Sequence, residues 1–178
     1  MSHVVIINGP AGVGKTTISF KLAEMLPGTI NISGDAIRWF APLDVGQYLG
    51  PGSTYRAGAS LTSAYLRMGA PRIIFDYVFD AAEKISRFCR WLPPDTPIYL
   101  FTIWAPIEVV IERVATREGR EPLGDLTIQT YREVERNLRF LGCTVQNTAS
   151  PEAAASEIFA KIAETEGAPA AGFARNAS

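Results

Sequence analysis

Histidine and cysteine are scarce in this 178-residue chain, which has one histidine and two cysteines. Cys89 and Cys143 are too few for a disulfide framework, and no Cys-x-x-Cys pair or Cys/His cluster points to structural zinc. A Ser-His-Asp or Cys-His mechanism needs a central histidine, which only His3 could supply. These absences predict a reduced, cytoplasmic protein that has neither a disulfide framework nor a zinc centre.

Long apolar runs and a strong charge imbalance are also absent. No stretch approaches the ~20 apolar residues of a membrane span. The apolar run over residues 4–7 is short, has no basic leader and runs straight into a glycine turn, unlike a signal peptide. The net charge is -1, which argues against a strongly basic nucleic-acid binder. We therefore expect no membrane partner, and the charge disfavours a nucleic-acid partner. We expect either a monomer or a homodimer.

Short apolar runs alternate with helical patterns along the chain. The runs, which are rich in β-branched and aromatic residues, predict strands at 4–8, 29–33, 72–77, 98–104 and 143–146. Helical spacing predicts helices at 15–26, 36–40, 55–68, 81–91, 106–117, 126–141 and 151–164.

The pattern of the predicted strands indicates the fold class. Because they are apolar without polar alternation, both of their faces should be buried. We therefore predict an α/β fold with three layers, α/β/α, around a five-stranded parallel sheet. One domain is expected over residues 1–166, and residues 167–178, which are rich in small residues, are expected to form a flexible tail.

The segment Gly9–Thr16 fits the pattern GxxxxGK[ST] and lies between a predicted strand and a predicted helix. In such a loop, backbone N–H groups and the helix N-terminus form a nest for phosphate. The lysine reaches the outer phosphates and the threonine hydroxyl ligates Mg²⁺, so ATP and Mg²⁺ are the expected cofactors. The alternative is a glycine-rich turn with a surface lysine. The candidate nucleotide contacts are Gly9, Pro10, Ala11, Gly12, Val13, Gly14, Lys15, Thr16 and Thr17.

Three aspartates lie at or just beyond the ends of predicted strands, which places them at the carboxyl edge of the sheet, where ligands bind in parallel α/β folds. Asp76 ends the third predicted strand, while Asp35 and Asp80 follow strands. Asp35 is placed to be the base that deprotonates a substrate hydroxyl. Asp76 is placed to bind Mg²⁺ through water or to hold substrate. Both could instead be helix N-caps, and Asp80 competes for either role.

Six of the arginines fall between residues 113 and 139. Arg117 and Arg120 flank a glycine in a predicted lid around residues 113–125, where they would contact phosphate as the lid closes. The alternation of cations and acids on the next helix favours a solvated face with local ion pairs. That face carries Arg132, Arg136 and Arg139, while Arg113 could serve either purpose.

Four aromatic residues lie near the predicted substrate pocket, although such residues more often belong to a core. They are Trp39, Phe40, Tyr48 and Tyr55.

With these motifs in place, the chain resembles the small-molecule kinase branch of the P-loop proteins, which includes shikimate, gluconate and nucleoside monophosphate kinases. The segments Gly34-Asp35-Ala36-Ile37 and Phe75-Asp76-Tyr77-Val78-Phe79 look most like those of the chloramphenicol phosphotransferases. The resemblance covers most of residues 3–165. It implies a shikimate-kinase-like P-loop NTPase fold and ATP-dependent phosphorylation of a small-molecule hydroxyl.

In that family Asp35 would be the catalytic base, and Arg117 and Arg120 would be lid residues. Lys15 of the phosphate motif is the fourth residue that we expect to take part in catalysis. Two segments depart from the family: Glu121-Pro122 replaces the expected Gly-Asp-Arg lid ending, and residues 44–60 have their own glycine-rich sequence. The acceptor therefore need not be chloramphenicol.

Other functions of the P-loop remain to be weighed against a kinase. A GTPase needs an Asn-Lys-x-Asp element, and none is present. A non-catalytic ATP-binding regulator and a nucleotide or nucleic-acid end kinase stay open, the latter because of the arginine cluster.

Overall fold

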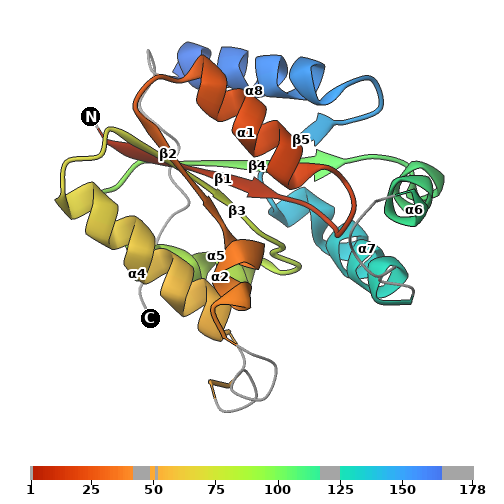
Figure 1. Cartoon of the computed structure of the whole chain (residues 1–178), viewed down its shortest axis with the longest axis horizontal. Coiled ribbons are helices and arrows are strands. Elements are labelled where there is room, and N and C mark those ends of the chain that lie inside the picture. The colour runs from red at the N-terminus through yellow and green to blue at the C-terminus, as the bar shows by residue number, and fades with distance from the viewer. Residues whose placement is uncertain (1, 42–48, 51, 117–124, 166–178) are drawn as a thin grey trace.

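The computed structural model describes residues 2–41, 49–50, 52–116 and 125–165. Within these ranges, five parallel strands form one sheet in the order β2-β3-β1-β4-β5 (Figure 1). The five-stranded parallel sheet predicted from the apolar runs is confirmed. The strands are β1 (His3–Asn8), β2 (Thr29–Ser33), β3 (Arg72–Asp76), β4 (Ile98–Trp104) and β5 (Cys143–Gln146).

Helices cover both faces of the sheet (Figure 1). Helices α1 and α8 pack side by side on one face, and α4 and α5 pack together on the other, with α2 against α4. The helices are α1 (Lys15–Met25), α2 (Gly34–Trp39), α4 (Ser53–Arg67), α5 (Ala82–Cys89), α6 (Ile107–Ala115), α7 (Asp125–Asn137) and α8 (Pro151–Thr165).

Alternate residues of β1 point into two separate cores, as a strand covered on both faces requires. Val5 and Ile7 belong to the core shared with α1 and α8. Val4 and Ile6 belong to the core shared with α4 and α5. Because all four side chains are fully buried, β1 is fixed at the centre of the sheet, and the loop that follows it is held at the carboxyl edge.

The helix predicted over residues 126–141 is shorter in the structure. α7 ends at Asn137, and a 3₁₀ turn follows over Leu138–Phe140. The Asn137 side chain donates a hydrogen bond to the backbone oxygen of Asp80 at 2.8 Å and another to that of Glu133. This amide thereby ties the end of α7 to the segment that follows β3.

The predicted flexible tail and the centre of the predicted lid lie outside the described residues.

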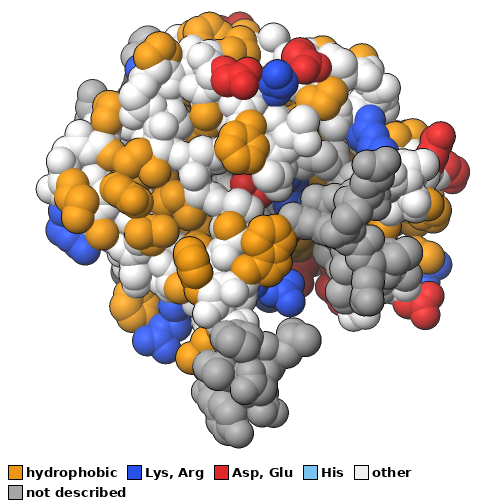
Figure 2. All heavy atoms as spheres, in the orientation of Figure 1, with side chains coloured by type: hydrophobic (Ala, Val, Ile, Leu, Met, Phe, Trp, Pro, Cys, Tyr) orange, Lys and Arg blue, Asp and Glu red, His pale blue; other side chains and the backbone are white. Residues whose placement is uncertain are grey.

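Hydrophobic side chains gather over α2 and α4 on the face seen in Figure 2. Among the exposed ones, Trp39 and Phe40 at the end of α2 are 67% and 84% exposed, so neither is a core residue.

None of the helices in the described ranges is both long and apolar enough to cross a membrane.

Gly58 in the middle of α4 allows a close contact between this helix and the sheet. A Cβ atom added there would lie 2.5 Å from the ring of Phe75. Helix propensity alone would make Gly58→Ala stabilising by ~1 kcal/mol. We expect the opposite sign, a loss of ~1–3 kcal/mol in the free energy of unfolding, because the buried ring has no room to move.

Urea unfolding followed by circular dichroism measures this change. Ala57→Gly, one residue earlier on the exposed side of α4, is the matched control and should cost ~1 kcal/mol from propensity alone. A Gly58→Ala variant that is more stable than the parent protein would contradict this packing.

Candidate functional site

The loop between β1 and α1, residues 9–14, carries the phosphate-binding motif and packs closely against α6. A Cβ atom at Gly12 would collide with the side chain of Val114 and approach that of Val110 at 3.3 Å. Gly12 also has a φ of 82°, a left-handed conformation that favours glycine. The motif therefore needs a glycine here for both its backbone shape and its contact with α6.

The first turn of α1 presents its backbone N–H groups to this loop. Gly14 is the N-cap in a left-handed conformation, no side chain caps the helix, and the first turn contains no acidic residue. Such a helix start favours an anion through its free N–H groups and its dipole. Lys15 is 8% exposed, and its Nζ donates a hydrogen bond to the backbone oxygen of Pro10 at 2.9 Å, so its charge lies across the loop.

Asp76 lies at the centre of a buried cluster of hydroxyl groups. In the sheet it pairs with Ile7 of β1 on one side and with Ser33 of β2 on the other. Its Oδ1 accepts a hydrogen bond from the Thr16 hydroxyl at 3.1 Å and one from Ser33 at 3.4 Å. Its Oδ2 accepts one from Ser19 at 3.2 Å. The structure thus joins the threonine of the phosphate motif to the carboxylate that ends β3.

Burial raises the pKa of Asp76 above its usual range, and the nearby negative charge of Asp35 raises it further. The Lys15 ammonium and the hydrogen bonds from Thr16 and Ser19 act in the opposite direction, but burial prevails. The ionised form of Asp76 therefore lowers the stability of the folded protein, and a cation bound beside the carboxylate would offset this loss.

Asp35 lies in the first turn of α2 and is half-buried. The N-cap of α2 is Ser33, so Asp35 is not the capping residue that the alternative interpretation required. Nor does Asp76 cap the turn after β3, since its carboxylate accepts hydrogen bonds from α1 and β2. Asp80 forms an ion pair with Lys84 at 2.5 Å, whereas it is Asp76 that contacts the motif.

Two buried asparagines of the site were not predicted from the sequence. Asn8 donates to the Thr102 hydroxyl at 3.0 Å and accepts from the backbone N–H of Phe79 at 2.7 Å. Asn147 donates from its side chain to the backbone oxygen of Val13 at 2.9 Å and so supports the phosphate loop. Both follow or end an apolar strand, which is the same signal that singled out Asp35 and Asp76.

The arginine predictions have mixed outcomes. Arg117 and Arg120 lie outside the described residues. Arg113 on α6 is half-buried, and its Nη1 is a buried atom with no hydrogen-bond partner in the described part of the chain. Arg132 and Arg136 are exposed, as expected, but no ion pair joins either of them to a described carboxylate.

The arginine and aromatic side chains that remain divide between surface and core. Arg139 lies over the ring of Phe140, with its Cζ atom 4.5 Å from the ring centroid. Tyr55 packs against Tyr77 and Phe79, while Tyr48 lies outside the described residues.

Asp76→Asn tests the electrostatic account of this cluster. Because the pKa of Asp76 is raised in the folded protein, the folded state binds this proton more tightly than the unfolded chain, and ionisation lowers stability as the pH rises. The neutral asparagine avoids that cost. We expect the variant to have a higher melting temperature than the parent at pH 7.5, and the difference to shrink as the pH falls toward 3.8, the usual value for aspartate.

Thermal unfolding across this pH range is the measurement. Asp95→Asn is the matched control, because Asp95 is exposed and has a φ of 60° that asparagine also tolerates. The quantity to follow is the melting temperature of the variant minus that of the parent. If this difference fell as the pH rose toward 7.5, the pKa of Asp76 would be lowered in the folded protein instead.

Comparisons with known proteins agree with this geometry. A family model described as AAA domain matches residues 4–138. A cytidylate kinase from Saccharolobus islandicus is 22% identical over 149 residues, which are 81% of this chain and 76% of that enzyme. A tRNA dimethylallyltransferase from Latilactobacillus sakei is 49% identical over 43 residues, which are 24% of this chain and 14% of the transferase.

Solved structures show the same fold. The tunicamycin resistance protein of Deinococcus radiodurans superimposes with a TM-score of 0.66 and 24% identity, covering 91% of this chain and 96% of that one. Shikimate kinase from Acinetobacter baumannii, solved in complex with shikimate, superimposes with a TM-score of 0.60 and 17% identity, covering 93% and 96%. The predicted P-loop fold, like that of shikimate kinase, is confirmed, as is the resemblance to kinases of this branch.

Proposed function

Because the chain belongs to the AAA domain family over a match that includes its phosphate loop and both carboxylates, we propose that it is an ATP-dependent phosphotransferase. Its acceptor would be a hydroxyl group of a small molecule, an antibiotic such as chloramphenicol or a metabolite. One observation carries this proposal: the Thr16 hydroxyl lies 3.1 Å from the Asp76 carboxylate, and Asp35 lies in the first turn of α2, just after the neighbouring strand β2.

The phosphate loop would hold the ATP. The N–H groups at the start of α1 bind phosphate oxygens, and Lys15 swings from Pro10 toward the outer phosphates. In this site the lysine also stabilises the charge that develops on the transferred phosphoryl group. Arg113, with a buried nitrogen that lacks a hydrogen-bond partner in the described ranges, is a further candidate for phosphate contact. Arg117 and Arg120 stay sequence predictions for the same role.

The residues present suit a magnesium ion. Thr16 and Asp76 offer the hard oxygen atoms that Mg²⁺ prefers. Burial raises the pKa of Asp76, and a neighbouring cation would favour its ionised form. When bound, the ion would neutralise phosphate charge during transfer. Asp76 would hold it directly or through water.

Asp35 would serve as the base. It lies in the first turn of α2, two residues beyond Ser33, which ends β2 and pairs with Asp76 in the sheet. Its half-buried position leaves part of the side chain accessible to an acceptor. There it would orient the acceptor hydroxyl and take its proton as the oxygen attacks the terminal phosphate.

Asp35→Asn separates binding from transfer. We expect the variant to bind ATP with nearly the affinity of the parent and to lower turnover at least ~100-fold, since the base is lost while the phosphate loop is intact. Calorimetry measures ATP binding, and transfer is followed with radiolabelled ATP over an acceptor panel of chloramphenicol, gluconate, shikimate and cytidine monophosphate.

Glu157→Gln is the control, because this exposed residue forms an ion pair with Lys161 on α8, and the substitution should change neither quantity. Unchanged turnover in Asp35→Asn would remove Asp35 from the role of base. The panel also separates acceptor classes: transfer to cytidine monophosphate alone would favour a nucleotide kinase, the candidate supported by the match to cytidylate kinase.

A further inference from the structure

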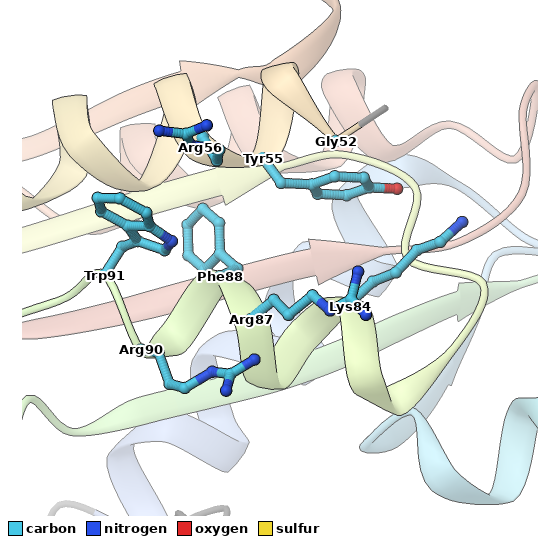
Figure 3. A pocket seen from close by; sticks show the side chains of 8 residues that line it. All are labelled: Gly52, Tyr55, Arg56, Lys84, Arg87, Phe88, Arg90 and Trp91. Carbon is cyan, nitrogen blue, oxygen red and sulfur yellow. The ribbon is translucent and has the colours of Figure 1, made fainter. Parts of the chain in front are cut away.

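A groove between α4 and α5 lies apart from the hydroxyl cluster around Asp76. Its volume is about 440 Å³, and its lining residues come from the start of α4 and from α5 with the two residues beyond it. None of the residues that surround Asp76 lines it. The volume lies within the range of ~300–1,000 Å³ that is typical of small-molecule sites. In Figure 3, Tyr55 and Lys84 lie at the end toward which the strand arrows point, and Trp91 lies at the other end.

Four of the eight lining residues are cationic, and none is acidic. Lys84 is paired with Asp80, but no described carboxylate forms an ion pair with Arg56, Arg87 or Arg90. Arg56 lies on α4, Arg87 lies on α5 and Arg90 directly follows α5, on the other side of the groove from α4 (Figure 3). Cations gathered in one groove repel one another, and a bound anion relieves that repulsion.

Aromatic rings form the other part of the lining and are held in place. Phe88 is fully buried and stacks on Phe75 with the ring centroids 4.6 Å apart. Tyr55 donates a hydrogen bond to the backbone oxygen of Val78 at 2.7 Å. Trp91 stays 50% exposed, so its ring is available to a ligand.

The two helices are also tied together at the Trp91 end of the groove. The Ser63 hydroxyl of α4 donates to the backbone oxygen of Trp91 at 2.6 Å. The Arg56 guanidinium lies over the Trp91 ring, 5.2 Å from its centroid. This stacking holds the guanidinium in place while its N–H groups keep their capacity to bind oxygen. The groove is therefore a preformed site that combines a ring surface with fixed positive charge.

We propose that this groove binds a small organic anion with a flat aromatic body. The ring of the ligand packs on Trp91, and its phosphate or carboxylate oxygens accept hydrogen bonds from Arg56, Arg87 and Arg90. The volume of about 440 Å³ favours a small molecule over a nucleic-acid strand, which needs a longer basic channel with several stacking rings. The site is separate from the ATP site and does not depend on kinase activity.

Calorimetric titration with 1-naphthyl phosphate tests this proposal on the full chain. The parent protein should bind the probe, and Arg87→Gln with Arg90→Gln should weaken binding at least ~10-fold, because two charge-assisted hydrogen bonds are lost. Both side chains are exposed, so the double variant should keep its fold, which thermal unfolding checks. Arg132→Gln with Arg136→Gln removes the same charge from α7 and should leave binding unchanged.

Two further titrations distinguish the groove from other sources of binding. Neutral 1-naphthol and inorganic phosphate should each bind at least ~10-fold more weakly than the probe, since each lacks one half of the recognition. Lys15→Ala should bind the probe like the parent. The proposal is overturned if the parent does not bind the probe, if MgATP or Lys15→Ala abolishes binding, or if a single-stranded RNA binds the groove arginines and the probe does not.

Discussion

The parallel pairing of β3 with both β1 and β2 is the constraint on which the rest of the site depends. It places Asp76 between Ile7 and Ser33, where three hydroxyl groups from two other elements converge on one carboxylate. A shift of the register by one residue would turn Asp76 to the other face of the sheet and break all of these contacts. The apolar residues of β1, buried in two cores, prevent such a shift.

This arrangement carries a cost in stability that fits a ligand site. Burial and the charge of Asp35 both disfavour the ionised form of Asp76. The phosphate loop has a similar character, because the first turn of α1 has neither a side-chain cap nor an acidic residue. A negative carboxylate that gains from a cation lies beside N–H groups that gain from an anion. Together, the carboxylate and the N–H groups suit a metal–phosphate pair better than either ion alone.

Much of this organisation could be predicted from the sequence. Apolar strands without alternation indicate a buried parallel sheet, and the motif at Gly9–Thr16 indicates a phosphate loop at its carboxyl edge. The same reasoning selected Asp35 and Asp76. Asn8 and Asn147 were missed because an amide at a strand end is not by itself a chemical signal, and its value here comes from backbone groups far away in the sequence.

The groove between α4 and α5 was also beyond prediction from the sequence. Arg56 meets Trp91 only because α4 and α5 pack side by side. From the sequence alone, Arg87 near the end of α5 and Arg90 just beyond it look like ordinary solvated residues. Planar, permanently charged arginine forks line the groove, while the one lysine of the motif serves the phosphate loop.

The central claim is that the phosphate loop transfers a phosphoryl group and does not merely bind a nucleotide. The most direct measurement compares transfer from radiolabelled ATP to hydroxylated small molecules by the parent protein and by Lys15→Ala. The account predicts a labelled acceptor with the parent and a loss of at least ~100-fold with the variant, because Lys15 stabilises the charge that develops in transfer. ATP binding by the parent without any labelled acceptor, or equal labelling by both proteins, would contradict it.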